Sequence, residues 1–386
     1  MSSKVFILLY YTCVVCYYGQ AGIFGPDTNY GGFFLIPLLL VNFVYCGKYL
    51  LSEASNPVMK ACTAFLILNT GYFVFEIVVL HNVSNIISLN FYKGVLLAIT
   101  CIYPSYFWSQ QGITFRYILL GMSLFAFITL WNTRLYNILL SDYTDFVDNT
   151  AYSFVSLLPC VFLIKKNSYI KLAYTSFLMA TIVSCAKRGA ILCGVVACLF
   201  IFTFLLKEKN GRLLFLKKVF IICAITIAAY YAITQFAQNA YVMERFEMMA
   251  AGNSSNRDVI YSNILNNWSA GHLYQLLFGQ GYCATPNLSD GTHFAHNDWI
   301  ELLADTGIFG VCFYIWFIIA LLKSALRSKD LTIRFMLLTS FIIWITKTLF
   351  SMSFMDEHNY ILSILIGYAL PLSQSRKSAV ISYQNH

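Results

Sequence analysis

The chain has 386 residues, of which 59% are hydrophobic and 11% charged, and it carries a formal net charge of +8. Soluble domains are usually about 45 to 50% apolar, so the composition excludes a soluble protein and predicts an all-α, polytopic membrane protein. The positive charge does not indicate binding to nucleic acid, because its placement along the chain follows the pattern of a membrane protein.

Apolar runs of about the length that a spanning helix needs, roughly 20 residues, recur twelve times. We interpret residues 1–386 as one integral membrane domain. The first run also resembles a secretory signal, but its removal would leave the other eleven with the wrong parity, so we expect an uncleaved span. The predicted spans are 5–23, 31–50, 58–80, 86–104, 114–131, 151–164, 169–186, 189–206, 219–235, 307–322, 335–353 and 359–372.

Eighteen of the 25 lysines and arginines fall on one side of this topology. By the positive-inside rule this side is the cytoplasm, so we expect both termini there and residues 236–306 as a large outer loop. Topology does not explain the remaining basic residues, which are therefore better candidates for function. They are Lys93, Arg134, Lys187, Arg188, Arg245, Arg257 and Lys347.

Glu76 and Lys347 are ionisable side chains inside apolar runs, where a charge is costly and usually faces a protein interior or a water-filled cavity. Glu76 lies in the third predicted span and Lys347 in the outer half of the eleventh. Lys347 either pairs with Glu76 or approaches an anionic ligand. Glu76 either forms a hydrogen bond between helices or has a functional role, and the sequence does not decide between the two.

Two cations, Lys187 and Arg188, stand at the outer end between the seventh and eighth predicted spans. The eighth span begins there, so its N-terminal amides and Arg188 would together form an anion site. Gly189 removes a side chain that would obstruct close approach. The alternative is that the basic residues extend to lipid headgroups.

The outer loop is too long for a simple connection, because structureless loops beyond about 12 to 15 residues are uncommon unless functional. Apolar residues at helical spacing predict a helix over 257–268, which begins at Arg257. Farther along, Gly279 and Gly281 permit backbone conformations that other residues resist.

Two histidines and three acids gather in 293–310, just ahead of an apolar run. Asp298 followed by Glu301 is typical of a capping box, so we expect a helix to start there. His296 would precede the helix N-terminus, whose partial positive charge favours the neutral imidazole. A neutral imidazole accepts a proton.

We weigh three kinds of chemistry for this cluster. His293 and His296 supply only half of a zinc site, and the sequence contains no further ligand motif, so we expect no metal and no cofactor. A nucleophilic triad would need a serine or cysteine in a recognisable elbow, which is absent from the sequence. The third is general base catalysis by His296 beside an arginine-lined phosphate site.

Several motifs, in order across residues 150–325, resemble those of the O-antigen ligase and O-antigen polymerase superfamily. The first 150 residues match only as a set of spans. The motifs are Arg188-Gly189 opening a span, the Arg257 helix ending in Trp268, Phe278-Gly279-Gln280-Gly281, and His296-Asn297 separated by nine residues from Gly307-Ile308-Phe309-Gly310.

This resemblance implies metal-independent, inverting glycosyl transfer at the periplasmic face of the bacterial inner membrane, with sugars carried on undecaprenyl diphosphate. It implies that His296 deprotonates or orients the acceptor hydroxyl while Arg188 and Arg257 hold the diphosphate of the donor. We expect further substrate contacts from Lys187, Asn297, Lys347 and Arg245. A flippase and a chain-length regulator are the protein partners that the resemblance suggests.

The leading functional hypothesis is a polymerase that joins lipid-linked repeat units into O-antigen or a related surface polysaccharide. The first alternative is a ligase that transfers finished glycan to the lipid A core in lipopolysaccharide biosynthesis. An alternative of another class is a flippase or transporter that binds the same lipid-linked sugar without chemistry. The long one-sided loop favours catalysis, because alternating access usually places its sites near the membrane midplane.

Overall fold

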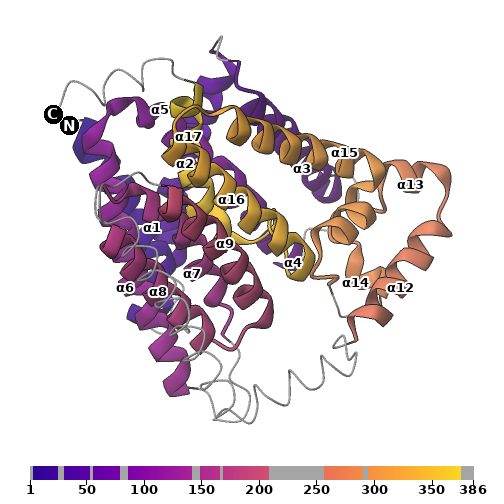
Figure 1. Ribbon diagram of the computed structural model, residues 1–386. Coiled ribbons are helices and arrows are strands. Elements are labelled where there is room, and N and C mark those ends of the chain that lie inside the picture. The colour runs from indigo at the N-terminus through magenta and orange to yellow at the C-terminus, as the bar shows by residue number, and fades with distance from the viewer. Residues whose placement is uncertain are drawn as a thin grey trace.

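The computed structural model describes residues 3–24, 30–52, 55–78, 86–140, 148–165, 168–207, 256–289 and 294–374. Throughout these ranges the regular structure is helical, as predicted (Figure 1). The ninth predicted span, 219–235, lies outside the described residues, as do Arg245 and His293.

Helices occupy the other predicted apolar runs and the described part of the outer loop, with α-helices written α and 3₁₀ helices η. They are α1 (Ser3–Phe24), α2 (Gly31–Leu50), α3 (Pro57–Val78), α4 (Ile86–Thr100), α5 (Ile102–Trp108), η1 (Ser109–Gln111), α6 (Ile113–Leu140), α7 (Ala151–Leu157), η2 (Leu158–Leu163), α8 (Ser168–Ser184), α9 (Arg188–Lys207), α12 (Arg257–Ser269), α13 (Leu273–Phe278), α14 (Thr285–Ser289), α15 (Asp298–Arg327), α16 (Leu331–Phe350), η3 (Glu357–Asn359) and α17 (Tyr360–Gln374).

Six described helices are long and apolar enough to cross a membrane, fewer than the twelve spans expected. Part of the difference is that two predicted spans are broken helices: 86–104 divides into α4 and α5 at Cys101, and 151–164 changes from α7 to η2 at Leu158. The six are Gly31–Leu50, Pro57–Val78, Thr114–Leu139, Arg188–Lys207, Asp298–Arg327 and Leu331–Phe350.

The outer surface of α2 indicates contact with lipid rather than water. Phe33, Ile36, Leu40 and Val44 recur at helical spacing, and each is more than 60% exposed. Soluble monomers rarely expose a contiguous apolar stripe of this kind. The composition and these surfaces together identify a polytopic membrane protein.

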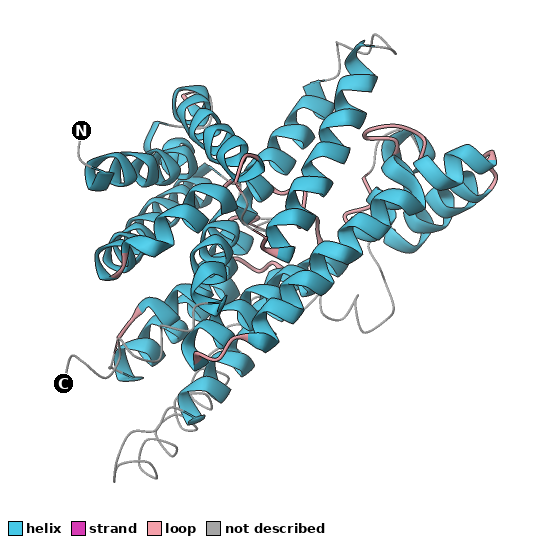
Figure 2. Ribbon diagram, turned by 90° about the horizontal axis from the view of Figure 1, so that it is seen from above, coloured by secondary structure: helices cyan, strands magenta, loops and turns pink. Residues whose placement is uncertain are grey.

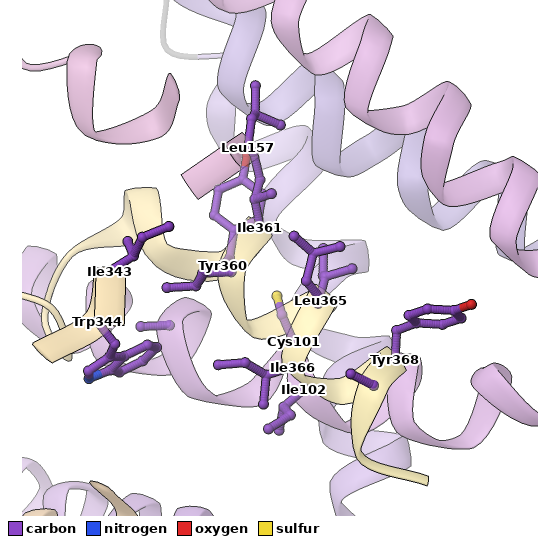
Figure 3. Close-up of a cluster of buried hydrophobic side chains, with 14 of the residues drawn as sticks. Cys101, Ile102, Leu157, Ile343, Trp344, Tyr360, Ile361, Leu365, Ile366 and Tyr368 are labelled. Atoms are coloured by element: carbon purple, nitrogen blue, oxygen red, sulfur yellow. The ribbon is translucent and has the colours of Figure 1, made fainter. Parts of the chain in front are cut away.

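The core is built around α17, whose side chains are buried from Tyr360 to Leu370. It packs against α5, α16 and α4, and Figure 3 shows Ile361, Leu365 and Ile366 between side chains of these neighbours. Polar groups add interhelical bonds: Ser363 donates to the Ala98 carbonyl, and Tyr360 donates to the Val14 carbonyl at 3.1 Å. Such bonds matter in a membrane protein, because lipid offers no competing partner.

The described part of the long loop forms a small helical lobe. Helices α12, α13 and α14 gather at the N-terminal end of α15, beside the main bundle (Figures 1 and 2). A minor core that includes Ile264, Leu288 and Ala304 joins α12 and α14 to α15, and α13 packs against α15. The helix predicted over 257–268 is confirmed as α12.

Gly367 provides a test of the packing around α17. A side chain there would overlap the Ile102 carbonyl and the Ser105 side chain. We expect Gly367→Leu to lower stability by about 1 to 3 kcal/mol or more, as overpacked cores do. Thermal unfolding in detergent measures the effect, with Gly121→Leu as the matched control because its Cβ would meet open space. Equal unfolding temperatures for the two variants would contradict this account of the core.

Candidate functional site

The predicted helix start at Asp298 is confirmed, but the residue that caps the helix is Asn297. The side chain of Asn297 accepts hydrogen bonds from the backbone N–H groups of Trp299 at 3.0 Å and Ile300 at 3.4 Å. Asn297, predicted as a substrate contact, therefore sets the direction of α15 and the position of the preceding residue, His296.

Asp298 is buried and connects α15 to the turn after α16. Its carboxylate accepts from the Tyr314 hydroxyl at 2.6 Å and from the Ser353 backbone N–H at 2.7 Å. The neighbouring Trp299 donates from its indole to Thr348 at 3.1 Å. The start of α15 is thus bound both to the last turn of α16, at Thr348, and to the turn that follows it, at Ser353.

Glu301 and Asp305 are fully buried and hold the loop that leads to His296. Glu301 accepts from the Thr285 hydroxyl at 2.6 Å and from the Ala295 backbone N–H at 2.7 Å. Asp305 accepts from the Ala284 backbone N–H at 2.8 Å. The acids thus fix loop backbone rather than forming a solvated face.

His296 lies in the left-handed region, with φ of 50°, and its side chain is exposed. This conformation is uncommon for residues other than glycine and persists where the surroundings impose it. The constraints come from both sides, because Phe294 stacks on Phe91 at 4.3 Å between ring centroids and Asn297 caps the helix. The backbone of His296 is thus held in place while its imidazole is exposed at the surface.

A pair of glycines joins α13 to a break in α15. Gly307 has φ of 64° and interrupts the helical conformation, while Gly279 has φ of 80°. A side chain on either would overlap the backbone of the other segment. The Gln280 N–H donates to the Ala304 carbonyl at 2.7 Å, a group that lies just ahead of the break. Gly279 and Gly307, one from each motif, therefore allow the same close backbone-to-backbone contact.

Arg257 and the beginning of α9 meet at the end of α16. The Arg257 guanidinium donates to the Phe350 carbonyl at 3.1 Å. A methyl group on Gly189 would overlap the Phe350 side chain and the Tyr152 hydroxyl. Gly189 therefore lets the α9 N-terminus, which carries Arg188, pack closely against the residue that Arg257 binds. Lys187 is in the turn just before α9, and its carbonyl accepts from Ile191.

The three predicted catalytic residues thus belong to segments that contact one short stretch, 348–353. Trp299 and Asp298 bind Thr348 and Ser353, Arg257 binds the Phe350 carbonyl, and Gly189 packs on Phe350. The segment that carries the exposed His296 and the starts of α9 and α12, which carry Arg188 and Arg257, thus meet at the C-terminal end of α16.

Lys347 pairs with Asp356 rather than with Glu76. Its ammonium lies 2.6 Å from the Asp356 carboxylate, donates to Asn359 at 2.9 Å, and is 1% exposed. Burial alone would raise the pKa of Asp356, but the neighbouring charges of Lys347 and His358 hold it below its ordinary value. Lys347 therefore fixes the turn between α16 and α17, and nothing in its contacts indicates a ligand.

Two other ionisable candidates also have defined surroundings. Arg134 is buried, lies over the Trp131 ring and donates to the Ser184 carbonyl at 3.0 Å, joining the ends of α6 and α8. Glu76 is next to Gly281, in the glycine segment that binds α15. Within the described ranges, no group of three or more His, Cys, Asp or Glu side chains is arranged to hold a metal ion.

The sequence did not assign the buried acids Glu301 and Asp305 to the site's supporting structure. Their partners, Thr285 and Ala284, are 16 and 21 residues away along the chain. The available signal was their charge ahead of an apolar run, since a buried carboxylate needs hydrogen-bond donors.

Comparison with known proteins connects these observations to a family. Residues 173–315 match the family described as O-antigen ligase. The match includes Arg188, Arg257 and His296, and it supports the predicted superfamily of O-antigen ligases and polymerases, whose members are glycosyltransferase-like enzymes. No curated protein matches the chain.

The Lys347–Asp356 pair yields a prediction for stability. Asp356→Asn leaves a buried ammonium without its counter-charge, so we expect a loss of about 3 kcal/mol, and the double variant Asp356→Asn, Lys347→Met should recover much of it. Because the folded pKa of Asp356 is lowered, its contribution is present above the ordinary pKa of about 4 and is lost as pH falls through the lowered value. Thermal unfolding of the three proteins at pH 7 and below pH 4 measures both effects. A double variant that is no more stable than Asp356→Asn would contradict the pairing.

Proposed function

We propose, with the match of residues 173–315 to the O-antigen ligase family as the premise, that the protein is a polymerase. It would join undecaprenyl-diphosphate-linked oligosaccharide repeat units into O-antigen or a related polysaccharide at the periplasmic face of the inner membrane. The observation that carries the proposal is the meeting of the His296, Arg257 and Arg188 segments at the end of α16.

The leaving group determines what the arginines do. When the bond between the anomeric carbon and the diphosphate oxygen breaks, the electron pair stays on the diphosphate, which gains negative charge. Arg257 uses one N–H for the Phe350 carbonyl, and its fork geometry leaves others for phosphate oxygens. Arg188 adds a second cation at a helix N-terminus. Hydrogen bonds to charged groups contribute about 1.5 to 3 kcal/mol each.

In the attack by the acceptor, His296 accepts the proton of the acceptor hydroxyl group. The acceptor hydroxyl oxygen attacks the anomeric carbon from the side opposite the diphosphate, which inverts the configuration. The hydroxyl proton passes to the imidazole of His296 and then to solvent, which the exposure of this side chain permits. A base fixed beside its substrate typically contributes about 10² to 10⁴ in rate.

A ligase is the second candidate, and the description of the matching family favours it. A ligase would use the same diphosphate site and the same base, but its acceptor would be a sugar of the lipid A core. The high aromatic content, 17%, is our ground for preferring the polymerase.

The role of His296 is tested by His296→Asn, because asparagine tolerates the left-handed backbone and cannot act as a base at neutral pH. We expect normal insertion and folding but a loss of chain extension of about a hundredfold or more. The measurement is polymer formed from purified lipid-linked repeat units. His272→Asn is the matched control, since His272 is an exposed N-cap residue and asparagine is also a good N-cap. Normal long-chain glycan in His296→Asn would refute the assigned role.

Deletion of the protein separates the two candidate functions. A lost polymerase leaves single repeat units attached to the lipid A core, because a separate ligase still transfers them. A lost ligase leaves the core bare while lipid-linked polymer accumulates. We expect the first pattern on gels of extracted lipopolysaccharide, and the second would replace our proposal with the ligase.

A further inference from the structure

A cavity of about 360 Å³ lies between α4 and the turn that follows α16. The proposed chemistry does not use it. Asn90, Phe91 and Lys93 line it from α4, and Ser351, Asp356 and His358 line it from the turn. Its volume is near the lower end of ordinary ligand pockets, about 300 to 1,000 Å³, which suits one or two small rings rather than a long chain.

Both walls of this cavity are attached to residues that flank His296. On one side Phe91 stacks on Phe294, two positions before the histidine. On the other side the turn that contains Ser351 binds Asp298 through Ser353, two positions after the histidine. A ligand in the cavity would therefore be held by the same segments that position the proposed base.

The cavity also adjoins the proposed diphosphate site. Ser351 directly follows Phe350, whose carbonyl binds Arg257. Of these two consecutive residues, Phe350 thus binds Arg257 and Ser351 lines the cavity. A transferase needs this relation, because the acceptor hydroxyl attacks the anomeric carbon from the side opposite the departing diphosphate.

The chemistry of the lining suits a carbohydrate. Asn90, Ser351, Asp356 and His358 offer amide, hydroxyl, carboxylate and imidazole groups, and Phe91 with Met352 and Met355 offers apolar surface. Sugar rings present hydroxyl groups at their edges and C–H groups on their faces, and both kinds of surface are matched here.

The polar groups of the turn are held in place before any ligand binds. His358 interacts with the Ser153 hydroxyl at 2.8 Å and stacks on Tyr18, while Asp356 is fixed by Lys347 at 2.6 Å. Groups fixed in this way lose little conformational freedom on binding, which favours selectivity among similar sugars.

We propose that this cavity binds the acceptor sugar, the ring whose hydroxyl attacks the anomeric carbon, and that Asn90 is one of the residues that select it. The proposal rests on the glycosyl transfer proposed above. It assigns the repeat-unit preference of the enzyme to α4 and the turn after α16, and it leaves the donor diphosphate to the arginines.

Asn90 is the residue to change, because it is exposed on the cavity side and its loss leaves the stack between Phe91 and Phe294 in place. Asn90→Leu removes the amide at nearly constant size, and Asn90→Trp fills the space. Asn132→Leu is the matched control, since Asn132 is an exposed asparagine on α6.

The assay uses purified protein, lipid-linked repeat unit as donor, and the oligosaccharide released from the same repeat unit by mild acid. The released oligosaccharide lacks a diphosphate and can act only as acceptor. We expect Asn90→Leu to raise the acceptor KM about tenfold, the cost of one hydrogen bond, and Asn90→Trp to raise it further. The donor KM, measured for transfer to saturating released oligosaccharide, should be unchanged in both variants, and Asn132→Leu should match the unaltered protein.

Two outcomes would overturn the proposal: a raised donor KM with a normal acceptor KM, or no change in either. If the unaltered protein transfers no sugar, the proposed function fails by itself. In that case the cavity assignment is tested separately, by measuring binding of the released oligosaccharide to the protein in detergent with saturation-transfer NMR. Binding that Asn90→Trp abolishes and Asn132→Leu preserves supports the cavity assignment, and equal binding by all three proteins refutes it.

Discussion

The buried carboxylate of Asp298 is the constraint on which the rest of the site depends. It accepts from Tyr314, farther along the same helix, and from the backbone of Ser353 in the turn after α16. Tyr314 in turn accepts from the indole of Trp344 in α16 at 2.7 Å. A buried carboxylate is costly unless its oxygens are matched by donors. The need to satisfy this group therefore fixes how the start of α15 meets the end of α16.

The break at Gly307 solves a second problem of the same helix. A continuous helix would use the carbonyls of Ala304 and Asp305 internally. The non-helical conformation of Gly307 leaves them to accept from Gln280 and Gly281 in the loop. Two sets of bonds thus attach the loop to α15. Backbone bonds hold Gln280 and Gly281, and the side chains of Glu301 and Asp305 hold the residues that follow them in the loop. These attachments let one residue between them, His296, keep an uncommon conformation.

The sequence predicted what depends on local pattern and missed what depends on distant partners. Apolar runs gave the helices, and spacing gave α12 and the start of α15, because these follow from the lengths and periods of helices. The partner of Lys347 was not predictable in this way: both Glu76 and Asp356 are acids at plausible depth, and only the turn before α17 brings Asp356 within 2.6 Å. The breaks within predicted spans were not predictable for a related reason, because a break such as that at Cys101 leaves the apolar run in the sequence unchanged.

The arrangement suggests how one scaffold can serve both polymerases and ligases. The diphosphate is common to their donors, so Arg257 and the α9 N-terminus would be retained whichever acceptor is used. The acceptors differ, and under our proposal the surface that discriminates among them is the cavity wall on α4 and on the turn after α16. Lys347 and Asp356 shape that turn from within the protein. A change of acceptor would then require new side chains on one helix face and one turn, while the bonds that position His296 stay as they are.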